Sequence, residues 1–303
     1  MSTDTTTSGQ SFLQKHHFLL RRLHSFTGIF PIGLFLIAHL TTNSSLVWGS
    51  FALRGKSYGA ESESVLGGAV AYFVKEVIWI NDQIPHLLLI EIALWASIAF
   101  HSVLGFVYAF SGQRNTRLYT YSSNWRYTLQ RWSGYIGILF IFYHVATLRW
   151  GWTFLIPGGT KWDSGYAAST LAMALRGVED GWTVAGVLVS LLYFAGVTLL
   201  VFHFANGLWT SAITWGLTIS RTAQRRWGYV CAALGLGLMV MGWSSLAGAL
   251  LIDVEKARAV EEVVIETYRG SDEDHGAPGE PAETIEAAQA IDTDAPASPS
   301  GDE

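Results

Sequence analysis

Five long apolar segments restrict the fold of this chain more than any other feature of its sequence. Each is near the roughly 20 residues that cross a bilayer as a helix, and Trp residues mark most of their ends, as at a membrane–water interface. Half of the 303 residues are hydrophobic, and only 14% are charged. We therefore predict an all-α integral membrane protein built on a five-helix bundle. The segments are Phe26–Trp48, Leu87–Phe110, Trp132–Leu148, Trp182–Trp209 and Trp227–Ile252.

Basic residues gather in three of the stretches that flank these segments. They are the N-terminal lead-in, residues 112–131 and residues 213–226, whereas the loops at 49–86 and 149–181 hold at least as many acids as bases. Loops on the cytoplasmic side of a membrane are enriched in Lys and Arg. We expect the N-terminus in the cytoplasm and, because the number of spans is odd, the C-terminus outside.

The two ends of the chain differ in composition from its apolar middle. Residues 1–22 are predicted to be a disordered N-terminus with a basic lead-in, and residues 23–252 the membrane domain. Residues 253–303 are predicted to be a charged extension of the last helix followed by a disordered acidic tail. The tail is acidic because residues 271–303 hold ten acids and no Lys or Arg, and such a segment has too little apolar surface to fold.

Four histidines, His39, His101, His144 and His203, lie one each in four of the apolar segments. An ionisable side chain in the hydrocarbon layer is costly unless it is paired or coordinating. Depths estimated from the helical rise of ~1.5 Å per residue group His39 with His144 in the outer half and His101 with His203 in the inner half. Because six-coordinate haem iron needs two axial ligands on opposite faces of a macrocycle, we expect two haems, one for each pair.

The four histidines could also have a role without haem. They could line a proton or ion pathway in a haem-free transporter, or have unrelated structural roles. A Zn or Cu site fits less well, because its ligands would converge at one depth. The single cysteine, Cys231, excludes a Cys-based metal site and the Cys-x-x-Cys-His attachment of a c-type haem, so any haem is held without covalent bonds. Haem content separates these alternatives.

A set of short motifs, in this order, resembles one family. The motifs are Arg21-Arg22-Leu23-His24-Ser25, Ile37-Ala38-His39-Leu40, Glu91 ten residues before His101, Tyr143-His144-Val145 and Phe202-His203-Phe204-Ala205-Asn206-Gly207-Leu208-Trp209. Together they are similar to the membrane-anchor cytochrome b subunit of succinate dehydrogenase, in its single-chain form with five helices and two haems. The resemblance covers about residues 16–230, and the stretch around His203 is its most specific part.

The resemblance implies a function in electron transfer. The subunit would anchor a flavoprotein and an iron–sulfur protein to the inner membrane of a bacterium, and pass electrons from the latter through two b haems to a quinone, menaquinone in our expectation. It implies the same histidine pairs as the depths do. Succinate oxidation would belong to the partners, because the chain has no dinucleotide fingerprint and no Cys cluster. Membrane lipid surrounds such a subunit, and nucleic acid is not expected among its partners. Fumarate reduction by quinol on the same scaffold stays an alternative.

Six further residues are candidates for site roles. Arg22, His24 and Ser25, with Arg131, are placed to neutralise or hydrogen-bond the propionates of the inner haem, although the arginines could instead be snorkelling residues at the membrane surface. Glu91 is the one charged residue of its segment. We expect it to exchange the proton of the quinone near the outer haem, with His86 at the mouth of that site.

Overall fold

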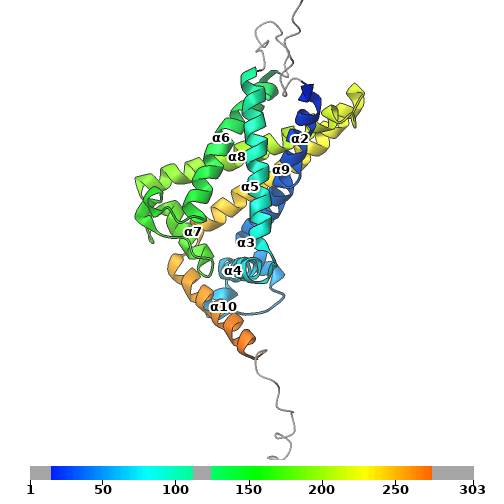
Figure 1. Ribbon diagram of the computed structural model, residues 1–303. Helices are drawn as coiled ribbons and strands as arrows, with labels where there is room; N and C mark the ends of the chain where they lie inside the picture. The colour runs from blue at the N-terminus through cyan, green and yellow to red at the C-terminus, as the bar shows by residue number, and fades with distance from the viewer. Residues whose placement is uncertain (1–14, 112–123, 275–303) are drawn as a thin grey trace, which may run out of the picture. The chain divides into compact units, whose positions relative to one another are not determined.

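The computed structural model describes residues 15–111 and 124–274. The chain divides into two compact units, residues 1–264 and 265–303, and the arrangement below is that of the first. Helices make up its architecture, and the described residues include no strand. The helices are α2 (His17–Ile29), α3 (Ile32–Ala52), α4 (Val65–Gln83), α5 (Leu87–Ser111), α6 (Asn124–Leu148), α7 (Ala167–Arg176), α8 (Val184–Thr214), α9 (Arg221–Leu251) and α10 (Val254–Asp274), with short 3-10 turns at Ala60–Glu63, Thr153–Leu155 and Pro157–Gly159 (Figure 1).

Some sequence-based predictions fall outside the described residues. The disorder predicted for the first residues and for the acidic tail concerns residues 1–14 and 275–303, which are not described. Part of one basic stretch used to predict orientation, residues 112–123, is not described either. The predicted basic lead-in, by contrast, is largely helical, because α2 begins at His17.

Within the described residues, four helical segments are long and apolar enough to cross a membrane. They are His17–Ala52, Leu87–Ser111, Val184–Thr214 and Arg221–Leu251, of 25 to 36 residues each. All four exceed the roughly 20 residues that a bilayer requires. They match the first, second, fourth and fifth predicted spans, apart from Trp182, Thr183 and Ile252, which lie just outside the helices. Many of their large apolar side chains, such as Leu34, Leu88, Leu188 and Leu236, are exposed, which suits a surface in contact with lipid.

The third predicted span, Trp132–Leu148, lies in α6 but is not among these four. With 25 residues, α6 is long enough to cross a bilayer at ~1.5 Å per residue, and its composition is what sets it apart. Its first turns carry Arg126, Gln130 and Ser133, which bond to residues of α8. A five-span bundle therefore stays a prediction.

The first predicted span is two helices rather than one. Between α2 and α3, Phe30 is extended at φ −135° and ψ 118°, and Pro31 follows it. Proline has no N–H to donate, so the hydrogen-bond ladder of α2 cannot continue through it. The break separates the part of the chain that holds His24 from the part that holds His39.

Helices distant in sequence pack against one another around a small apolar core. Helix α3 packs on α4 and α9, α8 packs on α9 and α6, and α2 packs on α5 and α8. Leu40 of α3, Val201 of α8 and Leu238 of α9 are buried together at the centre of this packing. The core fixes α3 and α8, and these helices carry two of the four histidines that the sequence singles out.

Helix α4, helix α7 and the first turns of α10 gather at one end of the bundle (Figure 1). At this end α9 stops at Leu251, Ile252 is extended, and the Asp253 carboxylate accepts the N–H of Lys256 to begin α10. The predicted extension of the last helix is thus a separate helix. Its break has a local cause, because an Asp at this position satisfies a first-turn N–H that would otherwise have no partner.

Glu261 of α10 is fully buried and joins α10 to the first turn of α7. Its carboxylate accepts the backbone N–H groups of Ala168 and Ser169, at 2.8 and 3.1 Å, and the Ser169 hydroxyl at 2.5 Å. The first N–H groups of a helix have no partner within the helix, and the helix dipole favours negative charge there. Glu261 therefore supplies the cap that the first turn of α7 lacks.

We predict that this attachment of α10 depends on pH. Burial raises the pKa of Glu261 to about 7 from its ordinary 4.5, and it outweighs the hydrogen bonds from Ser169 and Ala168, which lower the pKa. The attached state therefore favours the protonated acid. The contribution of Glu261 to the stability of the attached α10 is complete below about pH 4.5 and is lost as pH rises through about 7. The protection factors of the amides in the first turns of α10, which correct for the rise of the intrinsic exchange rate with pH, should fall about tenfold between these limits, and Glu261→Gln should flatten that profile. Glu262→Gln, at the exposed neighbouring position, is the control; an unchanged profile in Glu261→Gln would contradict the prediction.

Candidate haem sites

The four membrane histidines lie in two close pairs. His39 of α3 faces His144 of α6, with ring centroids 5.7 Å apart and ring planes 81° to each other. His101 of α5 faces His203 of α8, at 6.1 Å and again 81°. These are the two pairs into which the depth estimates sorted them, and each pair joins helices far apart in sequence.

The spacing of each pair suits one metal ion between two axial imidazoles. A metal–nitrogen bond of about 2 Å on each side, with the radius of both rings added, places the ring centres roughly 6 Å apart. Among the residues that the structure describes, no group of three or more His, Cys, Asp and Glu could hold a metal ion. A two-nitrogen donor set needs its other ligands from a macrocycle, so these pairs fit haem iron better than a bare Zn or Cu ion.

Backbone carbonyl groups orient the inner pair. The Nδ1 atom of His101 donates to the carbonyl of His24 at 2.9 Å, and Nδ1 of His203 donates to the carbonyl of Gln130 at 3.1 Å. The Ser133 hydroxyl also lies 3.2 Å from the same atom of His203. An imidazole nitrogen that faces a carbonyl must carry the proton, which leaves the Nε2 lone pair for a metal.

The outer pair has weaker partners, and they are side chains. Nδ1 of His144 lies 3.4 Å from the Tyr193 hydroxyl. Nδ1 of His39 lies 3.5 Å from the Asn43 amide nitrogen, which donates a firmer bond of 2.8 Å to the carbonyl of His39. A contact of 3.5 Å is at the limit of a hydrogen bond, so the outer rings depend more on packing for their orientation. Phe35 and Phe140 stack on His39 and His144 respectively.

Glycines let the inner rings approach helix backbones closely. A Cβ atom at Gly28 would lie 2.5 Å from Cε1 of His101, and one at Gly134 would lie 3.1 Å from Cε1 of His203. The first distance is a severe clash against a stiff ring. Each inner imidazole is therefore seated against the helix backbone of a neighbouring helix, α2 for His101 and α6 for His203.

Unpartnered polar atoms surround one side of the inner pair. The Arg22 Nε, the His24 Nδ1 and the Tyr108 hydroxyl are buried without a hydrogen-bond partner. Two of them lie beside His101: the His24 ring stacks on the His101 ring at 4.0 Å, and Tyr108 meets His24 edge-on at 5.8 Å. The Arg22 guanidinium lies over the Phe18 and Trp215 rings, at 4.2 and 5.5 Å. Buried donors of this kind normally have a partner. The two beside His101, a candidate haem ligand, fit an anion such as a haem propionate.

Ser25 and Arg131, the other predicted propionate residues, already have partners. The Ser25 hydroxyl donates to the carbonyl of Arg22 and accepts the indole N–H of Trp215 at 2.8 Å. Arg131 donates to the hydroxyl of Tyr127, one turn earlier on α6 and exposed. The structure therefore places His24 beside His101, places the Arg22 guanidinium over Phe18 and Trp215, and holds the half-buried Arg131 against Tyr127.

A different arginine, Arg126, reaches the inner pair through a chain of side chains. Its Nε donates to the Asn206 amide oxygen at 3.0 Å, Asn206 donates to the Gln130 amide oxygen at 2.8 Å, and Gln130 donates to the carbonyl of His203 at 3.2 Å. Sequence reasoning did not assign these roles. The available signal was Asn206, a buried polar residue three positions after His203 in an apolar segment.

Glu91 has an arginine as its partner. The Arg149 Nη2 lies 2.6 Å from the Glu91 carboxylate. One turn further along α5, Trp95 stacks on Trp150 at 5.6 Å, so α5 and the end of α6 are joined twice. The other predicted residue, His86, immediately precedes α5 with φ at +61°. Arg149 is thus the residue of this site that sequence reasoning missed.

The comparisons with known proteins point in one direction. No family model matches the chain. The chain is 31% identical over 235 residues to the succinate dehydrogenase cytochrome b558 subunit of Bacillus subtilis. That match covers 76% of this chain and 95% of the relative, so it takes in almost the whole of the related protein.

We predict that Asn206 is the critical link of the polar chain. Asn206→Leu would leave the Arg126 Nε and the Gln130 amide oxygen without partners, and each unsatisfied group costs roughly 1–3 kcal/mol. We expect the thermal midpoint of the purified protein to fall by several degrees. Thr210→Val, at an exposed position one turn further along α8, is the matched control. An Asn206→Leu protein as stable as the Thr210→Val protein would show that the chain contributes nothing.

Proposed function

This chain belongs to the family of succinate dehydrogenase cytochrome b subunits, and from this premise we propose that it carries electrons from an iron–sulfur partner to a quinone. It is a multi-pass membrane protein, with four helices apolar enough to span the bilayer. Its membrane part, residues 23–252, has α6 as a fifth span. The flavin and the iron–sulfur centres belong to two partner subunits, which oxidise succinate and dock on the cytoplasmic side.

The observation that carries the proposal is the geometry of the two histidine pairs. We assign His101 and His203 to an inner haem b, and His39 and His144 to an outer one. Each haem would supply a six-coordinate, one-electron carrier. The residues of the chain hold the two rings of each pair at 81° to each other and keep the Nε2 atoms of the inner pair free. The buried, unpartnered nitrogens of Arg22 and His24 are proposed to bind the propionates of the inner haem.

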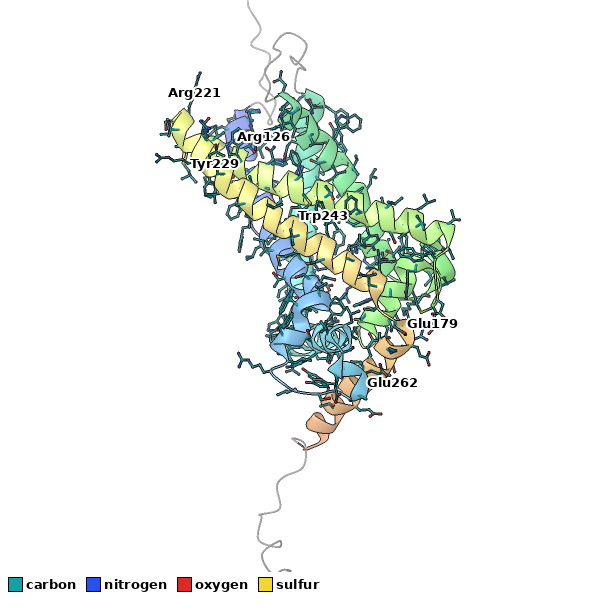
Figure 2. The ribbon with its side chains drawn as sticks, turned by 180° about the vertical axis from the view of Figure 1, so that it is seen from behind. Arg126, Glu179, Arg221, Tyr229, Trp243 and Glu262 are labelled. Carbon is teal, nitrogen blue, oxygen red and sulfur yellow. The ribbon has the colours of Figure 1, made fainter. Side chains whose placement is uncertain are left out.

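Charge at the two ends supports the proposed direction across the membrane. Arg126 and Arg221 lie at one end of the bundle, and Glu179 and Glu262 lie at the opposite end (Figure 2). Cytoplasmic surfaces are enriched in basic residues. We therefore place the end with Arg126 in the cytoplasm of a bacterium, at its inner membrane, and the C-terminus outside. Electrons then enter beside the inner pair.

The quinone is expected beside the outer pair, where Glu91 and Arg149 form their ion pair. Reduction of a quinone to a quinol takes two electrons and two protons, so the site needs a group that can pass protons. Glu91 is such a group, and the Arg149 guanidinium holds it in one position. His86, before α5, is proposed to pass protons to Glu91 from the surface. Menaquinone is our expected substrate, and the same residues would serve fumarate reduction by quinol.

We predict two haems b for each chain, removable one at a time. His39→Ala and His144→Ala should each lower the haem content from two to one, with loss of the same spectral component. His101→Ala and His203→Ala should remove the other component. Reduced-minus-oxidised spectra and pyridine haemochrome quantitation give these counts, and His275→Ala, outside the apolar segments, should keep both haems. A folded, membrane-inserted protein without haem would instead favour the haem-free proton relay.

We predict that Glu91→Gln keeps both haems and slows quinone reduction tenfold or more, because transfer of a proton by a positioned group typically contributes ~100-fold or more. The succinate:quinone reductase rate of the assembled complex is the measurement. Glu179→Gln removes a carboxylate from another exposed ion pair, with Arg258 at 3.0 Å, and should leave the rate unchanged. Full activity in Glu91→Gln would remove this residue from the proposed site.

A further inference from the structure

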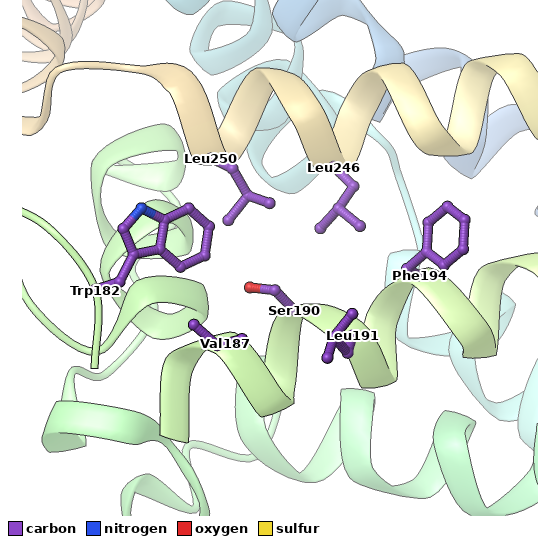
Figure 3. Close-up of a pocket in the computed structure, with 7 residues that line it drawn as sticks. All are labelled: Trp182, Val187, Ser190, Leu191, Phe194, Leu246 and Leu250. Carbon is purple, nitrogen blue, oxygen red and sulfur yellow. The ribbon is translucent and has the colours of Figure 1, made fainter. Parts of the chain in front are cut away.

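An apolar groove of about 410 Å³ runs between α8 and α9. Leu246 and Leu250 of α9 form one wall, and Trp182 lies at one end (Figure 3). The other wall is formed by four residues of α8, Val187, Ser190, Leu191 and Phe194. Val187, Leu191 and Phe194 are exposed, so the groove is open along one side. Because α8 and α9 are both apolar enough to cross a membrane, this open side meets lipid chains.

A buried arginine lies where the groove ends. Arg176, the last residue of α7, is only 8% exposed. Its Nη1 donates to the carbonyl of Ile252, at 3.3 Å, two residues after Leu250 in the groove wall. The groove residue Ser190 bonds to the carbonyl of Leu175, its neighbour in α7, at 3.2 Å. The C-terminal end of α7 and the end of the groove are therefore in direct contact.

The guanidinium of Arg176 has unused hydrogen-bonding capacity. Its Nε and Nη2 atoms are buried and have no partner. Among the described residues, the ion pairs found are Arg149–Glu91, Lys256–Glu61 and Arg258–Glu179, and none includes Arg176. A buried charge is costly unless an opposite charge and hydrogen bonds compensate it. An anion at this position would supply both.

We propose that the groove and Arg176 together bind a phospholipid with an anionic headgroup. One acyl chain lies in the groove, and the phosphate accepts hydrogen bonds from Nε and Nη2 of Arg176, after a small movement of the guanidinium towards the groove. Arginine suits this ligand, because its planar donors match two phosphate oxygens at once. Trp182 suits the level of the headgroups, since an indole combines an apolar body with an N–H donor.

The charge of Arg176 favours an anionic phospholipid over a quinone as the molecule bound in the groove, although the isoprenoid tail of a quinone is also apolar. A quinone headgroup is neutral and would leave the guanidinium charge uncompensated. A phosphate brings a negative charge as well as acceptors. The site shares no residue with the proposed quinone site, since Glu91 pairs with Arg149 and neither of these residues lines the groove.

The test is lipid retention by the complex purified in detergent through this subunit. After delipidation, dioleoyl phosphatidylglycerol or dioleoyl phosphatidylcholine is added back, and native mass spectrometry counts the lipids that stay bound. We expect one phosphatidylglycerol for each chain, held at least tenfold more tightly than phosphatidylcholine. Arg176→Gln should lose this preference. The control Arg258→Gln removes the same charge from an arginine that pairs with Glu179 and should keep the preference.

A second variant keeps the proposal testable if Arg176→Gln fails to fold. Leu246→Trp fills the groove and leaves the guanidinium in place, so it should lower phosphatidylglycerol retention about tenfold while the haem spectrum stays unchanged. Equal retention of both lipids by the wild type, or undiminished phosphatidylglycerol retention by either folded variant, would overturn the proposal. Loss in the variants with a normal haem spectrum would establish the lipid site independently of the quinone chemistry.

Discussion

Lipid chains offer no hydrogen bonds, so each polar side chain inside the spanning helices must find its partners within the protein. The inner pair shows how this is done. His101 bonds to the backbone of α2, His203 bonds to the backbone of α6, and both bonds use Nδ1. A carbonyl at a helix interior is a fixed acceptor, so these rings have little freedom to turn. The bundle is arranged so that two such rings face each other.

The same constraint explains why α6 differs from the other long helices. Gln130 bonds both to His203 and to Asn206, and Arg126 completes the chain at the end of the bundle. Gln130 and Arg126 occupy the first turns of α6, and Arg131 and His144 lie in the rest of the helix, so α6 has no apolar stretch comparable with those of the four spanning helices. A membrane helix that carries polar residues for a cofactor is less apolar, so it is harder to recognise as a span from its sequence.

Sequence could predict the helical class, four of the apolar helices and which histidines face each other, because helical rise and segment order fix depth. It could not predict the partners of those histidines. Arg149 and Glu91 are 58 positions apart, and only the packing of α6 beside α5 brings them together. Likewise Arg126 and Arg131 are both basic residues near the start of α6, and the direction of each side chain decides which one reaches α8. The separate α10 begins at a break where Ile252 is extended and the Asp253 carboxylate accepts the N–H of Lys256.

Charged residues at the end of the bundle where α4, α7 and α10 gather are compensated in different ways. The Glu261 carboxylate caps the N-terminal turn of α7, where the helix dipole is positive. Arg176 reaches the carbonyl of Ile252, just past the C-terminal end of α9, where the dipole is negative. Each charge therefore lies at the helix end whose dipole has the opposite sign. The two differ in their hydrogen bonds, because the Glu261 carboxylate accepts three and the Arg176 guanidinium donates one. Arg176 is buried with two unpartnered nitrogens and is bonded to Ile252, two residues after the groove residue Leu250. It is therefore better explained by a ligand with both a phosphate and an acyl chain than by helix capping alone.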